Sequence, residues 1–563
     1  MTSTILVVMK TSFRTHKSCN RTEFFYYKKS KKLAASLLNN VFIITVTRAQ
    51  NYMSFIEKGV LTIGTAIIFV CCTLNYTNSD ATANYFVYAS VFDNNVVEDL
   101  DEDDEVILNP ILKNSDLKVE EVSNGLDFPT SMAFLGPDDI LVLEKNEGTV
   151  RRILNGVLLE EPLLDVDVAN KGERGMLGIA ITNNNNNNNS NSNSGNNSDT
   201  PYVFLYYTES EKEGDDDDGK EAKGNRLYRY ELENNKLVNP ELLLDLPAAP
   251  GPTHNGGKIV IGPDDKLYLA IGDVGGHDLE NPHTIINNKN GLEPDGRAGI
   301  LRFSQDGKAV NNSRIEENEE KEQEEEEKGD SILSDKYPLN LYYAYGIRNS
   351  FGLDFDPVTG KLWDVETGRN FGEEINLVEP GFNSGWMKAQ GIWELNENLR
   401  KEGIASLNDT TFLSELVDFD GKGKYSPPEF ASDKMPITTS GMAFFHSHRL
   451  GKQYENDLFV GDFVNGMIFD FDLNEDRTQL SFNRGGPLED KVVDKVEELD
   501  EVIFGLGFGG ITDIKIGPYD GYLYVLSLDR GGDECKPSHP GRACIPYSST
   551  VEGHIFRIIP AAT

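Results

Sequence analysis

One strand pattern recurs six times between about Asp116 and the C-terminus, and it is the feature that most restricts the fold. In each copy a short apolar strand ends in a tight turn, a second apolar strand follows, and a later strand completes the unit. The copies begin near Met132, Leu177, Ile259, Leu353, Met442 and Ile514. Short strands repeated along one chain, with almost no helical periodicity, are typical of radial repetition. The sequence therefore predicts an all-β, six-bladed β-propeller with four-stranded blades. A pair of β-sandwiches is the alternative, but it does not explain the recurrence.

The propeller is expected to fill residues 116–563, preceded by a hydrophobic N-terminal segment. Residues 1–58 are interpreted as a basic extension in which Met53 is the expected true start. Residues 59–76 include the apolar run Val60–Leu74 behind a basic flank, which is typical of a signal peptide or a membrane anchor. Residues 77–115 are predicted to be an acidic linker. This order predicts a protein outside the cytoplasmic membrane, either secreted or anchored at the cell surface.

Three low-complexity runs interrupt the repeat, at 183–198, 209–222 and 313–332. The first is rich in Asn and Ser and the other two are acidic, so none carries enough apolar content to pack. We expect all three to be insertions in loops. With 53 Lys and Arg against 92 Asp and Glu, the net charge of −39 also argues against nucleic acid as a partner.

Two of the five cysteines, Cys535 and Cys544, bracket a short loop that contains Pro and Gly. In an exported protein such a pair favours a disulfide, and two free thiols are the alternative.

A histidine and an aspartate stand at the two ends of one predicted hairpin. His254 lies in the Gly-rich turn Thr253–Gly257, a strand and a Gly-Pro-Asp turn follow, and a second strand ends at Asp273. Antiparallel strands joined by a tight turn bring their far ends together. The hairpin can thus place the Asp273 carboxylate beside the imidazole of His254, as a general base requires. A surface-loop histidine near a turn aspartate is the other interpretation.

Three motifs make the chain resemble the soluble glucose/sorbosone (aldose sugar) dehydrogenases. They are His254-Asn255-Gly256-Gly257 with Ile271-Gly272-Asp273, then Gly346-Ile347-Arg348-Asn349, and then Glu366-Thr367-Gly368 followed by Glu374-Ile375-Asn376-Leu377. The resemblance spans about Val119 to Pro560. It implies a six-bladed propeller that oxidises a sugar with pyrroloquinoline quinone and calcium.

The resemblance also implies a role for each matching residue. His254 would take the proton of the sugar C1 hydroxyl, and Asp273 would support it. Arg348 would stabilise negative charge on the quinone oxygen, and Asn349 would hydrogen-bond the cofactor. Carbonyl groups of Gly368 and Arg369 would bind the calcium and the cofactor, and Glu374 would help to hold a second calcium, since oxygen ligands suit this hard cation.

The sequence departs from the family pattern where cations should grip the quinone carboxylates. Val464 stands at the position of a lysine, and Gly510 and Thr512 stand at the positions of two arginines. Unpaired carboxylates are expensive to bury, so this departure counts against quinone binding.

Three functions therefore stay open. The first is an aldose dehydrogenase, the second is a non-catalytic propeller that binds a carbohydrate or a protein on the same face, and the third is a calcium-dependent lactonase or hydrolase. The sequence names neither the sugar nor the electron acceptor.

Overall fold

The computed structural model describes residues 69–77, 80–88, 108, 110–182, 201–212, 221–275, 287, 293–310, 331–368, 371–394, 406–407, 411–433, 437–529 and 551–561. The chain divides into two units, Met1–Glu105 and Val106–Thr563.

In the first unit, β1 (Phe69–Thr77) pairs antiparallel with β2 (Asp80–Tyr88). These strands overlap the predicted signal or anchor segment and the predicted linker. Among the described residues, no helix has the length and apolar character needed to cross a membrane. Whether the segment directs export stays a prediction.

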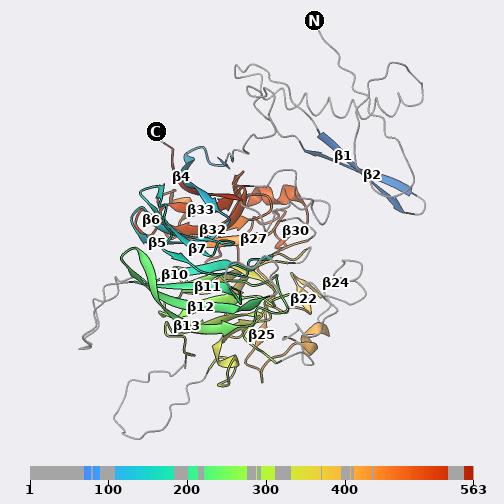
Figure 1. Ribbon diagram of the computed structural model, residues 1–563. Helices are drawn as coiled ribbons and strands as arrows, with labels where there is room; N and C mark the ends of the chain where they lie inside the picture. The colour runs from blue at the N-terminus through green and yellow to red at the C-terminus, as the bar shows by residue number, and fades with distance from the viewer. Residues whose placement is uncertain are drawn as a thin grey trace, which may run out of the picture. The chain divides into compact units, whose positions relative to one another are not determined.

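The second unit is built from six sheets of four or more strands (Figure 1). The first sheet contains β5 (Pro129–Gly136), β6 (Asp139–Glu144), β7 (Thr149–Leu154) and β8 (Val157–Leu158), with β9 (Leu164–Asp165) beside β7. The second contains β10 (Met176–Ile181), β11 (Tyr202–Ser210), β12 (Ala222–Glu233) and β13 (Lys236–Leu246). The third contains β14 (Ile259–Ile261), β15 (Leu267–Ile271), β16 (Gly299–Phe303), β17 (Tyr342–Tyr345), β21 (Phe382–Asn383) and β25 (Lys424–Tyr425).

The remaining three sheets follow the same plan. The fourth contains β18 (Ser350–Phe355), β19 (Leu362–Glu366), β20 (Glu374–Val378), β26 (Phe430–Ser432) and β30 (Val492–Val493). The fifth contains β27 (Thr439–Phe444), β28 (Leu458–Asp462), β29 (Ile468–Phe471), β31 (Ile503–Leu506) and β3 (Ile111–Leu112). The sixth contains β32 (Gly510–Ile516), β33 (Leu523–Leu528), β34 (Glu552–Pro560) and β4 (Leu117–Asp127).

Short elements lie between the sheets. They are β22 (Ala389–Gln390), β23 (Trp393–Glu394) and β24 (Ser406–Leu407), with the 3-10 turns η3 (Leu339–Leu341), η4 (Thr411–Glu415), η5 (Lys452–Tyr454) and η6 (Val496–Glu501).

The first strands of the six sheets form a ring. β5 lies next to β10, β10 next to β14, and so on through β18, β27 and β32, which lies next to β5. Each of the six largest apolar clusters fills the space between two neighbouring sheets. Apolar burial between sheets is thus what holds the ring together. The predicted all-β propeller is confirmed.

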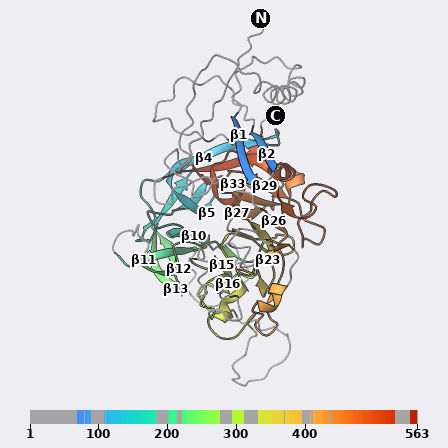
Figure 2. The same ribbon diagram turned by 90° about the vertical axis from the view of Figure 1, so that its right-hand side faces the viewer.

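The ring closes by pairing the two ends of the domain. In the sixth sheet the N-terminal strand β4 pairs antiparallel with the C-terminal strand β34, and Figures 1 and 2 show β4 against the red C-terminal strands. This arrangement leaves no unpaired seam in the ring.

Every one of the six sheets contains the four predicted strands, and several sheets carry further short strands that the sequence did not predict. Strands of two or three residues extend the outer edges of the third, fourth and fifth sheets, for example β25 (Lys424–Tyr425), β30 (Val492–Val493) and β3 (Ile111–Leu112). Such short strands leave no periodic trace in the sequence, but they cover edge hydrogen-bonding groups that would otherwise face solvent.

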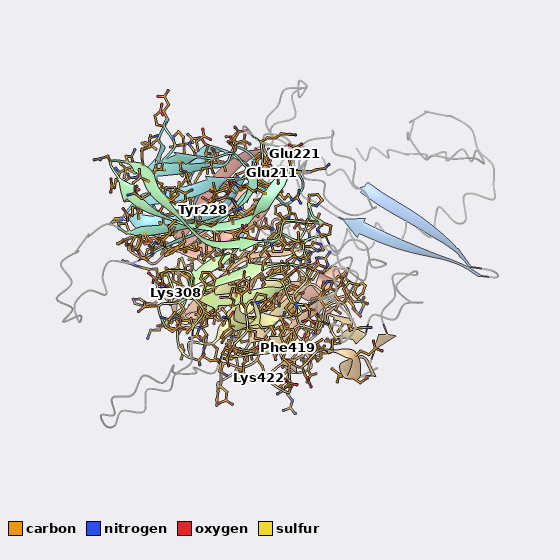
Figure 3. The ribbon with its side chains drawn as sticks, turned by 60° about the horizontal axis from the view of Figure 1, so that its bottom comes forward. Glu211, Glu221, Tyr228, Lys308, Phe419 and Lys422 are labelled. Carbon is orange, nitrogen blue, oxygen red and sulfur yellow. The ribbon has the colours of Figure 1, made fainter. Side chains whose placement is uncertain are left out.

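Both ends of the insertion predicted at 209–222 belong to strands, because β11 ends at Ser210 and β12 begins at Ala222. Glu209 lies in β11, where it pairs with Lys223 at 2.8 Å and with Arg226 at 2.8 Å. Glu211 N donates to Glu221 O at 2.6 Å, and Figure 3 shows these two residues close together where the insertion leaves the hairpin. At the end of the insertion predicted for 313–332, Ile332 packs against the core. Residues 183–198 lie outside the described residues.

Candidate active site

The hairpin of β14 and β15 brings His254 and Asp273 together, as the sequence predicts. His254 Nδ1 lies 2.6 Å from Asp273 Oδ1, and each residue is 1% exposed. His254 has a φ of 60°, a left-handed conformation that costs free energy and is common at functional sites. The two residues thus form a buried pair held by backbone geometry.

A glycine allows a third segment to reach this pair. A Cβ atom on Gly272 would lie 2.3 Å from Arg348 O and 2.6 Å from His254 O, closer than any side chain tolerates. Asp273 N also donates to Arg348 O at 3.0 Å. Gly272 is therefore needed for the close approach of the segments that carry His254 and Arg348.

Arg348 lies in the loop between β17 and β18, and it is 4% exposed. Its Nη1 donates to Thr367 O at 2.6 Å, and its backbone N donates to Glu366 Oε1 at 2.5 Å. Burial lowers the pKa of Arg348, while the negative charges of Asp273 and Glu173 oppose that change. The guanidinium is thus a fixed cation among several acids.

Two polar atoms of the Gly346–Asn349 motif have no hydrogen-bond partner within the described part of the chain. They are Arg348 Nε and Asn349 Oδ1, and both are buried. Buried polar atoms are usually paired, so these two are suited to a ligand's polar groups.

Glu173 completes this side of the site, and sequence reasoning missed it. Its Oε2 accepts hydrogen bonds from His254 N at 2.7 Å and from Asn349 Nδ2 at 2.9 Å. Glu173 precedes β10, just as His254 precedes β14 and Asn349 precedes β18. The available signal was this shared position in the loop that leads into the first strand of a blade.

Trp386 was also missed. Its Nε1 donates to Asp273 Oδ2 at 2.7 Å, and the Arg348 guanidinium lies 5.5 Å from the centre of its ring. Burial would raise the pKa of Asp273, but His254, Arg348 and Trp386 hold it below its usual value. Asp273 is therefore a carboxylate that binds the imidazole through one oxygen and the indole through the other.

The contacts around the predicted calcium ligands do not decide whether calcium binds there. Gly368 N donates to Glu373 Oε1 at 3.1 Å, whereas Arg369 lies outside the described residues. Glu373 Oε2 accepts from Thr439 N at 3.1 Å, and burial raises the pKa of Glu373 to about 8. Among the described side chains, no three His, Cys, Asp or Glu residues form a group that could hold a metal ion. Calcium bound through backbone carbonyl groups stays a prediction.

Glu374 belongs to a buried set of acids on β19 and β20. It faces Glu366 across the two strands, and Ser384 Oγ lies 2.6 Å from Glu366 Oε2 and 3.2 Å from Glu374 Oε2. Glu374 Oε1 accepts from Gly391 N at 2.5 Å. Burial raises the pKa of Glu366 to about 7 and that of Glu374 well above its usual value. Burial and the negative charge of Glu366 therefore raise the pKa of Glu374, while the hydrogen bond from Gly391 N opposes that change. The predicted calcium role of Glu374 stays a prediction.

The three positions expected to carry cations lie in the fifth and sixth sheets. Val464 follows β28 and its N donates to Asp462 Oδ1 at 2.9 Å. Gly510 begins β32, and Thr512 Oγ1 donates to Leu526 O at 3.3 Å. In the same sheet, Asp513 forms a buried ion pair with Lys258. Lys258 is thus already engaged by a carboxylate.

A family model described as Glucose / Sorbosone dehydrogenase matches residues 126–535, more than half of the chain. The chain belongs to this family. It is therefore a member of a family of sugar oxidoreductases, which confirms the predicted family and enzyme class.

Two relatives illustrate the similarity. Aldose sugar dehydrogenase YliI of Escherichia coli is 24% identical over 424 residues, which cover 75% of this chain and 93% of that protein. Quinoprotein glucose dehydrogenase B of Acinetobacter calcoaceticus is 32% identical over 176 residues, 30% of this chain and 32% of that protein.

A solved structure supports the fold. A protein of Thermus thermophilus described as an oxidoreductase (glucose dehydrogenase) is 23% identical, with a TM-score of 0.51 over 79% of this chain and all of that one. At this identity the likeness supports the fold alone.

Cys535 and Cys544 lie outside the described residues, and their disulfide stays a prediction.

Proposed function

We propose that this chain oxidises an aldose at C1 by hydride transfer to pyrroloquinoline quinone, with His254 as the general base. The observation that carries the proposal is the 2.6 Å contact between His254 Nδ1 and Asp273 Oδ1 in a buried site beside Arg348. Membership of the family described as Glucose / Sorbosone dehydrogenase supports the class of reaction.

Asp273 sets the tautomer of the base. Because its carboxylate accepts a hydrogen bond from Nδ1 of His254, the ring carries its proton there and Nε2 is the basic nitrogen. Nε2 takes the proton of the C1 hydroxyl, while the hydrogen on C1 leaves with its electron pair. The C1–O bond becomes a carbonyl, so a cyclic aldose yields a lactone. The buried carboxylate also stabilises the imidazolium that forms.

Pyrroloquinoline quinone, when bound, supplies the acceptor for the two electrons. At its reactive end the residues fit, because Arg348 Nε and Asn349 Oδ1 are buried and have no partner among the described residues. Arg348 is held in place by its bond to Thr367 O, so its charge needs little reorganisation when negative charge develops nearby. Calcium held by carbonyl groups of Gly368 and Arg369 is part of the proposal.

At the carboxylate end the fit is weaker. Val464, Gly510 and Thr512 offer no positive charge, and several carboxylates surround Arg348. We therefore expect the quinone to bind less tightly than it would to a site with three cations at these positions.

The test combines binding with turnover. Calcium-loaded protein is titrated with pyrroloquinoline quinone by calorimetry, and a panel of aldoses is then oxidised with an artificial electron acceptor. We expect quinone binding and sugar oxidation, and His254→Ala should keep the first and lose most of the second. Absence of both in the wild-type protein contradicts the proposal.

A second candidate is a non-catalytic propeller that binds a carbohydrate or a protein at the same site. The missing cations at Val464, Gly510 and Thr512 favour it. Binding of a sugar by calorimetry, with no quinone binding and no oxidation, is the result that would select it.

The proposal extends to location. The apolar run Val60–Leu74 behind a basic flank supports export across the cytoplasmic membrane. A reporter fused after residue 78 should be found outside the cytosol, and a wholly cytosolic reporter would contradict export.

A further inference from the structure

Trp386 joins the two charged parts of the site. Its Nε1 donates to Asp273 Oδ2 at 2.7 Å, and its ring faces the Arg348 guanidinium at 5.5 Å from the ring centre. The residue is 4% exposed, so both contacts are made away from bulk water. One side chain therefore touches both the acid of the buried pair and the neighbouring cation.

The two carboxylate oxygens of Asp273 contact different side chains. Oδ1 meets His254 Nδ1 at 2.6 Å, and Oδ2 receives the indole N–H. A carboxylate held at both oxygens keeps its plane fixed, which in turn fixes the orientation of the imidazole. A donor on Oδ2 also withdraws charge from Oδ1, and this weakens the pull of Asp273 on the ring proton.

The aromatic face acts on the neighbouring cation. A guanidinium within about 6 Å of a ring centre is attracted by the ring, and the attraction is stronger where water is excluded. Arg348 Nη1 is bound to Thr367 O, so the ring and that carbonyl hold the guanidinium from two sides. Trp386 thus constrains the base pair and the cation together.

We infer that Trp386 is a positioning residue that holds the Asp273–His254 pair and Arg348 in one arrangement, through its indole N–H and its ring face. The inference rests on the proposed function for its catalytic meaning. Its physical content, an effect of Trp386 on the state of His254, holds whether or not a sugar is oxidised.

The first experiment separates the N–H from the ring. Trp386→Phe keeps an aromatic face for Arg348 and removes the donor to Asp273, whereas Trp386→Leu removes both. Without the donor, Asp273 becomes a better acceptor and the imidazolium of His254 is stabilised. We therefore expect the His254 titration to move to higher pH by up to about one unit, a tenfold change in proton affinity, in both variants.

The readout is the ring-nitrogen NMR spectrum of His254 across a pH titration, in protein without sugar or quinone. The chain has 8 histidines, and His254→Gln identifies the signal. The charged groups to consider are Asp273 on the ring, Glu173 on the backbone N and Arg348 near Asp273. Glu366 on β19 also acts on Asp273, and its own pKa is about 7, so its titration is followed in the same series.

Trp363→Phe is the matched control. Trp363 is 0% exposed, its Nε1 has no partner within the described residues, and it lies in the apolar cluster between the fourth and fifth sheets. This substitution removes the same atoms from a buried indole, so it should leave the His254 titration unchanged. An unchanged His254 titration in Trp386→Phe overturns the inference, and so does a shift in the control Trp363→Phe equal to that in Trp386→Phe.

Two further measurements keep the test decisive. If Trp386→Phe does not fold, the indole N–H of Trp386 in the wild-type protein is followed instead, and Asp273→Asn should shift its signal and speed its exchange with solvent. Absence of that response overturns the inference.

If sugar oxidation is found, Trp386→Leu should lose about tenfold more kcat/KM than Trp386→Phe. Equal losses would show that the ring face of Trp386 does not position Arg348.

Discussion

Replacing Asp457 by asparagine should stabilise the propeller at high pH and leave it almost unchanged at low pH. Asp457 precedes β28 and is 7% exposed. Burial and the negative charges of Asp470 and Asp472 raise its pKa to about 8, and its carboxyl group hydrogen-bonds to that of Asp472. In the folded protein Asp457 therefore carries a proton at neutral pH.

The sign and size of the effect follow from linkage. A carboxyl group whose pKa is raised by folding contributes stability that is fully present below its unfolded pKa, near 3.8, and is lost as pH rises toward its folded pKa, near 8. A shift of this size corresponds to at most about 6 kcal/mol. Because Asp472 is exposed and water reaches the cluster, we expect about 2–3 kcal/mol.

The assay is urea unfolding of the wild-type protein and Asp457→Asn at pH 5, 7 and 9. Asparagine can donate to Asp472 at every pH, so the variant should gain stability over the wild type as pH rises. Asp476→Asn in the following exposed loop is the control and should show no such gain. Parallel curves for the wild type and Asp457→Asn at all three pH values would refute the reasoning.

Three further predictions concern the site and the insertions. His254→Ala should lower the turnover number by about a hundredfold to ten-thousandfold with quinone affinity nearly unchanged, and Asp273→Asn should lower it less. Steady-state kinetics measures the turnover number and calorimetry the quinone affinity. A loss of quinone affinity as large as the loss of turnover would contradict the assignment of His254 as the base. The triple variant Val464→Lys, Gly510→Arg, Thr512→Arg should tighten quinone binding by about a kcal/mol for each charge pair. The backbone allows an arginine at position 510, because Gly510 is not among the glycines with positive φ. Unchanged quinone affinity would show that cations at these positions do not bind the quinone. Deleting residues 183–198 and 316–328 should leave the melting temperature within a few degrees, whereas a larger fall would show that these runs pack.

The sequence allowed the ring and its strand order to be predicted because both depend on local patterns. In the first, third, fourth and sixth sheets the first two strands are joined by short turns, and apolar strands on either side of such turns mark these hairpins in the sequence. The His254–Asp273 contact was predictable for the same reason, since one hairpin carries both residues.

The contacts that were missed are non-local. Trp386 reaches Asp273 across 113 residues, and Glu173 reaches His254 across 81. Neither residue stands in a motif with fixed spacing to its partner. The two-residue strands at the outer sheet edges were missed because elements so short carry no periodicity.

The candidate site is divided between blades: the residues around His254 lie in one set of blades, and the positions expected to carry cations lie in another. Glu173, His254 and Arg348 lie in the loops that lead into β10, β14 and β18, the first strands of three successive blades. Val464, Gly510 and Thr512 lie in the next two blades, and the hydrogen bonds described above for Val464 and Thr512 stay within those blades. These bonds do not join the two groups, but the buried ion pair between Lys258 and Asp513 links the third blade to the sixth. Because that pair does not involve Val464, Gly510 or Thr512, substitutions at these three positions can leave it in place. We therefore expect the proposed base His254 and Arg348 to keep their geometry when the three positions change, so cations restored there should strengthen quinone binding without altering the contact between His254 and Asp273.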